Sequence, residues 1–176
     1  MAILQRNKIL IALIALILFF SYLASLILTS FGSVEVKTLR LDTQNNQYLI
    51  YDLYKPKIAS KENKAPFIAI IPGFQRSKEA LSNIAIELSR RGYVVALIDP
   101  YAQGLSSSSL STRAATTEGY GMFSLVEYVH SGAFEYVDID RIGATGHSMG
   151  GNAAIRGADY FLSLIHISEP TRPSWI

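Results

Sequence analysis

Cysteine is absent from the 176-residue chain, and neither sign of charge dominates it. Without cysteine the protein can form neither disulfide bonds nor structural metal sites with thiolate ligands. The formal net charge is only +2, and this balance gives no indication of a surface for nucleic acid. Internal repeats are missing as well. We therefore expect one folded domain with no metal, no cofactor and no nucleic-acid partner.

Charge is missing altogether from residues 9–28, which are almost entirely apolar. A helix of this length spans about 30 Å, the thickness of the hydrocarbon core of a bilayer. Arg6 and Lys8 precede the run and favour a cytoplasmic location for residues 1–8. We predict a single-pass membrane anchor over residues 9–28 that binds the lipid bilayer. Everything from Ser33 onward should then lie outside the cytoplasm.

The alternative for this segment is a signal peptide that is cleaved after export. The apolar core of a signal peptide usually has about 7–15 residues, which is shorter than this run. The candidate cleavage site, Ser30-Phe31-Gly32, fits the small-x-small pattern poorly. Under this alternative the domain is secreted rather than anchored.

The other end of the chain reads unlike part of a protein fold. Residues 162–172 match, in a single reading frame, the translation of a transposon-type sequencing-library adapter. Segments of this origin are excluded from fold reasoning. We therefore expect residues 162–176 to be a non-native tail, and the visible native sequence to end at about Phe161.

The native part opens with the pattern of an antiparallel hairpin. Residues 34–41 alternate apolar and polar side chains, as a half-buried strand does. After a turn at residues 42–46, a second strand runs over residues 47–54 and is ended by Pro56. Residues 57–64 form a charged linker. The hairpin is typical of the edge of a sheet.

Beyond the linker, the hydrophobic pattern changes to that of a parallel sheet. Residues 67–71 and 93–98 form short apolar runs, typical of strands buried on both faces, and residues 142–145 form a third strand. Residues 77–91 and 122–129 repeat apolar side chains at helical spacing between them. This alternation predicts an α/β fold with parallel strands and right-handed crossover helices.

The last strand leads directly into Gly146-His147-Ser148-Met149-Gly150, a G-x-S-x-G sequence followed by a predicted helix. In this context the pattern indicates a nucleophile elbow, a sharp turn that lifts a serine above the sheet. The turn needs small residues two positions before and after the serine, and Gly146 and Gly150 meet that need. The alternative is a glycine-rich turn that holds an ordinary serine.

With these pieces in order, the chain resembles the N-terminal half of the α/β-hydrolase fold, over residues 34–161. Within that fold it is most similar to the branch of dienelactone hydrolases, cutinases and polyester hydrolases. The resemblance depends on three segments: Ile71-Pro72-Gly73-Phe74-Gln75, the elbow at residues 146–151, and the loop at residues 99–106. The loop departs from the D-x-x-G-x-G-x-S pattern of relatives, because Ala102 or Gln103 stands where they have the middle glycine.

The resemblance implies a role for each matching residue. Ser148 would attack the carbonyl carbon of an ester and form an acyl-enzyme that water hydrolyses. The backbone N–H groups of Phe74 and Met149 would form the oxyanion hole. Tyr101 and Gln103 are candidates to line the substrate pocket. Asp99 is more consistent with a structural loop residue than with a catalytic acid.

A triad in this fold continues from the serine to an acid and then to a histidine, each after a later strand. Neither position occurs before Phe161, so we expect the catalytic Asp or Glu and the His to be absent from this chain. Without a base, and with one sheet edge unpaired, the fragment should be inactive and poorly folded.

The parent protein is then a membrane-anchored serine hydrolase acting outside the cytoplasm on a small-molecule, lipid or polymer ester. Three alternatives remain open. They are a serine peptidase of the same fold, a non-catalytic binding module built on it, and a short protein whose main function is the anchor.

Overall fold

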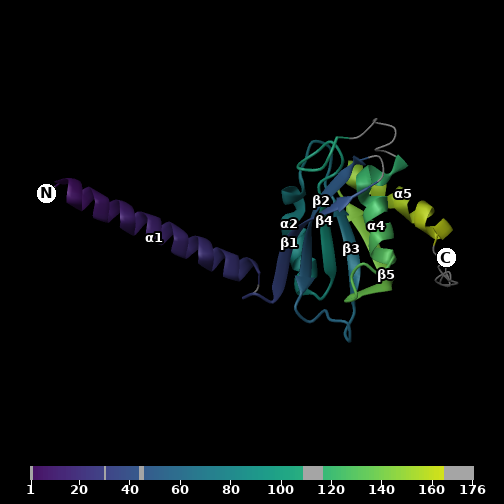
Figure 1. Cartoon of the computed structure of the whole chain (residues 1–176), viewed down its shortest axis with the longest axis horizontal. Coiled ribbons are helices and arrows are strands. Elements are labelled where there is room, and N and C mark those ends of the chain that lie inside the picture. The colour runs from purple at the N-terminus through teal and green to yellow at the C-terminus, as the bar shows by residue number, and fades with distance from the viewer. Residues whose placement is uncertain (1, 30, 44–45, 109–116, 165–176) are drawn as a thin grey trace, which may run out of the picture.

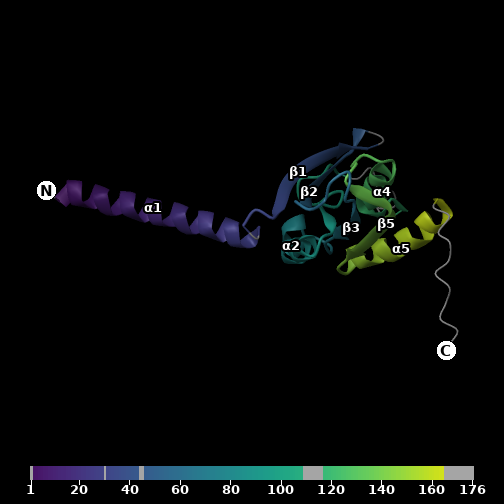
Figure 2. The same ribbon diagram turned by 90° about the horizontal axis from the view of Figure 1, so that it is seen from below.

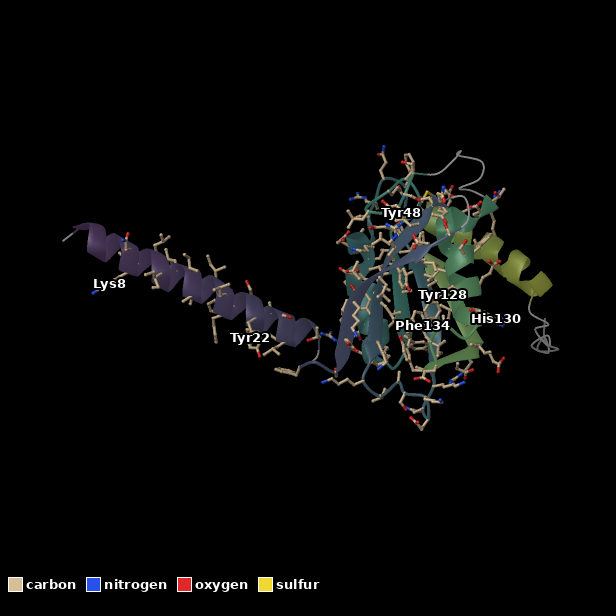
Figure 3. All side chains as sticks on the ribbon, in the orientation of Figure 1. Lys8, Tyr22, Tyr48, Tyr128, His130 and Phe134 are labelled. Carbon is tan, nitrogen blue, oxygen red and sulfur yellow. The ribbon has the colours of Figure 1, made fainter. Side chains whose placement is uncertain are left out.

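The computed structural model describes residues 2–29, 31–43, 46–108 and 117–164, which form a long N-terminal helix and an α/β domain (Figure 1). The helix, α1 (Ala2–Leu28), extends away from the domain, and the described side chains of residues 7–27 point outward all around it (Figure 3). Its apolar part, Asn7–Ile27, has 21 residues with a mean hydropathy of 2.7 and is 0% buried. By length and composition this helix can cross a membrane, and a signal sequence passes the same test.

The domain is built on a five-stranded sheet with the strand order β1-β2-β4-β3-β5. The strands are β1 (Val34–Asp42), β2 (Tyr48–Pro56), β3 (Ala65–Ile71), β4 (Val94–Ile98) and β5 (Val137–Gly146). β1 and β2 form an antiparallel hairpin at one edge, in a register that sets Val34 opposite Pro56. β4 and β5 both run parallel to β3, and β2 joins β4 antiparallel. The predicted edge hairpin and parallel strands are therefore confirmed.

Helices cover both faces of the sheet, so the apolar strands are buried on both sides. They are η2 (Lys78–Leu81), α2 (Ser82–Arg90), η3 (Gly119–Gly121), α4 (Met122–His130) and α5 (Met149–Leu164). α2 and α4 lie on opposite faces (Figure 2). Ala85 and Ile86 of α2 pack with Val95 and Leu97 of β4 in one core cluster. The opposite core cluster contains the buried side chains of α4, Ala153 of α5, and the alternate strand residues such as Phe67 and Val94.

The predicted helix over residues 77–91 is wrong in its first turn. Lys78–Leu81 form a 3₁₀ turn, the α-helix begins only at Ser82, and Ser77 makes no side-chain capping hydrogen bond. A contact from outside the helix holds this turn in place. The Oδ1 atom of Asp99 accepts the backbone N–H of Lys78 at 2.7 Å, which fixes the first turn against the loop after β4.

β5 also differs from its prediction, because it begins at Val137 rather than at residue 142. Its pairing with β3 is interrupted by a register shift between Ala65 and Phe67. Within the described residues β5 is the outer strand on its side, and Gly143, Ala144 and Thr145 are exposed.

Candidate active site

Ser148 lies between the end of β5 and the start of α5, and its side chain is exposed. Its φ angle is +52°, in the left-handed region that non-glycine residues rarely adopt. Such a conformation costs on the order of 1–3 kcal/mol and persists only where the surroundings hold it. Two hydrogen bonds do so here: the His147 N–H donates to the Ile71 carbonyl at 3.1 Å, and the Gly150 N–H donates to the His147 carbonyl at 2.9 Å.

Steric crowding explains the two glycines of the elbow. A Cβ atom added at Gly146 would lie 2.6 Å from the Ile71 carbonyl oxygen and 2.6 Å from the Gly150 carbonyl carbon. One added at Gly150 would lie 2.7 Å from the Ile71 carbonyl carbon and closer still to its oxygen. All of these neighbours are backbone atoms, which cannot rotate away. Only glycine therefore fits at either position.

The loop after β3 passes directly beside the serine. A Cβ atom at Gly73 would lie 2.9 Å from Nδ1 of His147 and 3.5 Å from Cβ of Ser148. Phe74 follows in this loop with a side chain that is 70% exposed. Met149, half-buried, is the first residue of α5, where backbone N–H groups lack partners within the helix. The fold thus brings Phe74, Met149 and Ser148 into one small region.

Gln103 reaches this loop from the loop after β4. Its Oε1 atom accepts the backbone N–H of Gln75, a residue that also has a left-handed φ of +56°. An open depression of about 440 Å³ lies here, lined by Phe74, Gln75, Arg76, Ser77, Ala102, Gln103 and Gly104. Gln103 therefore lines the depression, and its side chain also holds the backbone of the residue that follows Phe74.

Tyr101 lies elsewhere. It is 3% exposed, and its hydroxyl is hydrogen-bonded at 2.6 Å to Oγ1 of Thr43. Burial raises the pKa of its phenol. It lines a separate cavity of about 180 Å³ with residues of the η3–α4 region, among them Phe123 and Ser124. Tyr101 and Gln103 thus line different cavities, and a role for either in substrate binding stays a prediction.

Asp99 joins the two loops that frame the depression. It is 1% exposed, and its Oδ1 accepts the Lys78 N–H at 2.7 Å. Its Oδ2 accepts the Leu105 N–H at 3.0 Å. Gly104 has a φ of +55°, and a Cβ atom there would collide with this carboxylate. Both carboxylate oxygens thus accept hydrogen bonds from backbone N–H groups, as expected for a structural residue.

Lys78 is a buried charge that the sequence analysis missed. It is 5% exposed, and its ammonium lies 3.3 Å from Oδ2 of Asp52 and also contacts Glu79. Burial opposes this charge, but the hydrogen bond to Glu79 and the charge of Asp52 outweigh it and raise the pKa of Lys78. The same hydrogen bond lowers the pKa of Glu79 to about 2. A lysine at the start of a predicted helix carries no signal of burial, since that position is normally solvated.

Removing the Asp99 carboxylate should be costly. In Asp99→Ala the N–H groups of Lys78 and Leu105 lose their acceptor. The buried Lys78 donor left unsatisfied costs about 1–3 kcal/mol, and the part-buried Leu105 donor adds less. We expect the free energy of unfolding to fall by about 1–4 kcal/mol, as measured by denaturant titration. Asp140→Ala is the matched control, because Asp140 is exposed. Equal losses in the two variants would contradict the structural role of Asp99.

Other catalytic groups are not assembled around Ser148. Within the part of the chain that the structure describes, no carboxylate or imidazole is hydrogen-bonded to Ser148, and no cluster of His, Cys, Asp or Glu can hold a metal ion. His147 precedes the serine, and His130 ends α4. The absence of a triad acid and base from the whole chain stays a prediction.

The sequence and the fold both resemble those of known proteins. The family model described as "PETase: PET hydrolase-like" matches residues 23–172. The fold resembles an esterase from Pyrococcus furiosus, with a TM-score of 0.58 and 24% identity over 73% of this chain and 49% of the esterase. It also resembles Est1E of Butyrivibrio proteoclasticus, solved with bound ferulic acid. The TM-score is 0.60 and the identity 21%, over 72% of this chain and 49% of Est1E.

An acetyl xylan esterase from Paenibacillus sp. R4 has a TM-score of 0.61 and 16% identity, over 72% of this chain and 45% of the esterase. At such identities the likeness shows the fold alone. The chain spans less than half the length of each of these three structures. No curated protein matches it in sequence.

Proposed function

The chain belongs to the PET hydrolase-like family, and from that membership we propose that its parent protein hydrolyses carboxylic esters through Ser148. The observation that carries the proposal is the exposed serine at a left-handed turn between β5 and α5. A strained turn of this kind sets the hydroxyl above the sheet, where a substrate can reach it. Its oxygen attacks the ester carbonyl, the alcohol leaves, and water hydrolyses the acyl-enzyme.

The negative charge that develops on the carbonyl oxygen needs donors that are already in place. We propose the N–H groups of Phe74 and Met149 as these donors. The start of α5 adds the partial positive charge of a helix N-terminus. Losing one oxyanion donor typically costs about 10²–10³ in turnover. Gln103 supports the first donor, because it holds the next residue, Gln75, by its backbone N–H.

The substrate class follows from the walls of the site. The depression between the loops after β3 and β4 is open, and the exposed ring of Phe74 offers an apolar surface at its edge. This suits an ester with an apolar part, whether a small molecule, a lipid or a polymer. No cofactor is needed for such a reaction.

We propose that α1 is a single-pass anchor, with residues 1–8 in the cytoplasm and the domain, residues 34–161, outside. The 21-residue apolar stretch, 0% buried, supports a spanning helix, and Arg6 and Lys8 ahead of it favour this orientation. A cleaved signal peptide is the remaining alternative. That residues 162–176 are a non-native tail stays a prediction. We propose that the native sequence of the parent protein continues instead through the triad acid and histidine.

A fluorophosphonate probe tests the proposal on the full-length parent protein. It should modify one residue, found by mass spectrometry in the tryptic peptide 142–156, whose single serine is Ser148. Heat-denatured protein serves as the control, because labelling requires the folded site. Modification of a different residue would overturn the assignment of the nucleophile. No modification at all would favour a binding module on the same fold.

A further inference from the structure

The end of α1 is tied to the domain by a hydrogen bond. The Nη2 atom of Arg90, at the end of α2, donates to the carbonyl oxygen of Ile27 at 2.7 Å. Ile27 is also where the apolar stretch of α1 ends. If that stretch spans a hydrocarbon core of about 30 Å, Ile27 lies at the boundary between hydrocarbon and headgroups. Arg90, and whatever surrounds it, must then lie at the level of the lipid headgroups.

Three segments of the chain meet near the end of α1 (Figure 1). The Lys57 N–H donates to the Ser33 carbonyl at 2.8 Å, and the Lys57 ammonium lies 3.6 Å from the position of a Cβ at Gly32. The Cδ1 atom of Ile58 lies 3.5 Å from the corresponding position at Gly92, just after α2. The linker after α1, the loop after β2 and the end of α2 therefore form one continuous surface.

This surface exposes large apolar side chains among cations. Phe31 is 76% exposed and Ile58 is 65% exposed. Lys57 lies next to Ile58 in the chain, and the Arg91 side chain is 69% exposed. Glu87 offsets part of the charge, because it pairs with Arg91 at 3.1 Å and with Arg90 at 3.5 Å. Apolar side chains flanked by Lys and Arg are typical of segments that lie in a membrane interface.

We propose that these residues, Phe31, Lys57, Ile58 and Arg91, form a second membrane contact, here called the juxtamembrane patch. Phe31 and Ile58 insert among the headgroups of the bilayer that α1 crosses, and Lys57 and Arg91 bind the phosphates of anionic lipids. The inference rests on the proposed anchor. It adds that the domain is held against the bilayer rather than hanging from a free tether.

The lack of cysteine makes a site-specific test direct. Single-cysteine variants Ile17→Cys, Ile58→Cys and Leu105→Cys of the full chain are labelled with a nitroxide and reconstituted into vesicles. The vesicles contain either phosphatidylcholine alone or an equal mixture with phosphatidylglycerol. Leu105 is the matched control, since it is aliphatic and 65% exposed like Ile58 but lies in the loop after β4. The measurement compares how strongly a water-soluble nickel complex and oxygen each enhance the relaxation of the nitroxide label.

The labels at positions 17 and 58 should be shielded from nickel, and the label at position 105 should be fully accessible. The anionic vesicles should shield position 58 more strongly than phosphatidylcholine does. Adding Lys57→Gln should shift the docked population about fivefold toward the aqueous state, as expected for one basic side chain near an anionic surface.

Each part of the assignment can fail separately. Shielding at position 17 with free access at position 58 would overturn the juxtamembrane patch and leave the anchor intact. Free access at position 17 would overturn the anchor and the patch together. Neither result bears on Ser148, whose role is tested by the fluorophosphonate probe. Shielding at position 58 that is equal in neutral and anionic vesicles would overturn the proposed binding of lipid phosphates.

Discussion

Ser148→Ala is expected to lower kcat for ester hydrolysis by the full-length parent protein by about 10⁴–10⁶-fold, with little change in KM. Alanine keeps the backbone of the elbow but removes the oxygen proposed to form the acyl-enzyme. The depression at Phe74 and the proposed backbone donors are left unchanged by the substitution. The rate that remains should be about 10³–10⁴-fold above the reaction in water, because the oxyanion hole and binding persist without the nucleophile.

The measurement is steady-state hydrolysis of a chromogenic acetate ester, with the rate of the buffer alone subtracted. Ser131→Ala is the matched control. Ser131 follows α4, and its hydroxyl only donates to the Tyr128 carbonyl at 2.7 Å, so its removal should leave kcat unchanged. If Ser148→Ala kept a tenth of the wild-type rate, another residue would have to be the nucleophile.

In the full-length parent protein, Gly150→Ala is expected to lower stability and to abolish activity at the same time. Helix propensity alone predicts the opposite, since alanine in a helix is favoured over glycine by about 0.5–1 kcal/mol. Here the added methyl group meets the backbone of Ile71, 2.7 Å from its carbonyl carbon. Overpacking typically costs about 1–3 kcal/mol, and we expect the upper end of that range here because the neighbours are backbone atoms that cannot rotate, so the clash outweighs the propensity. The melting temperature should fall by roughly 6–12 °C.

A second glycine of the same region supplies the control for this variant. A Cβ atom at Gly143 would lie 3.9 Å from its nearest neighbours, an ordinary van der Waals distance. Gly143→Ala should therefore change the melting temperature by little, and it should leave the elbow in place. A similar loss of stability in both variants would mean that β5 rejects any added methyl group, and that the packing of Gly150 on Ile71 is not special.

The sheet could be predicted from the sequence because each strand carries its own signal. β4 is five apolar residues buried along its whole length, and the hairpin of β1 and β2 shows period-two alternation. The first turn of the predicted helix 77–91 could not be read in this way. It is held by Asp99, 21 positions away from Lys78, and no local pattern reports a partner at that distance.

The candidate site also has parts that could be predicted from local sequence and parts that could not. The elbow is local, since the strand, the two glycines and the helix start all lie within a few residues of Ser148. The supports of the loop that carries Phe74 are not local. Gln103 holds the N–H of Gln75 across 28 positions, and Asp52 lies opposite the buried Lys78. Tyr101 and Gln103 are two residues apart in sequence, yet they face different cavities because the chain turns at Ala102, where φ is +63°.

The direction of the parallel strands has a consequence for what the protein can reach. β3 and β4 begin beside the loop of Ile58 and the end of α2, and they finish at the loops of Phe74 and Gln103. A strand of five residues is about 16 Å long, so the mouth of the site and the juxtamembrane patch lie at opposite ends of the sheet, at least that far apart. The strands run across the axis of α1 (Figure 1), so this separation is directed along the proposed bilayer and not away from it. A site mounted in this way would open beside the membrane surface, within reach of esters at that surface as well as of those in the surrounding medium.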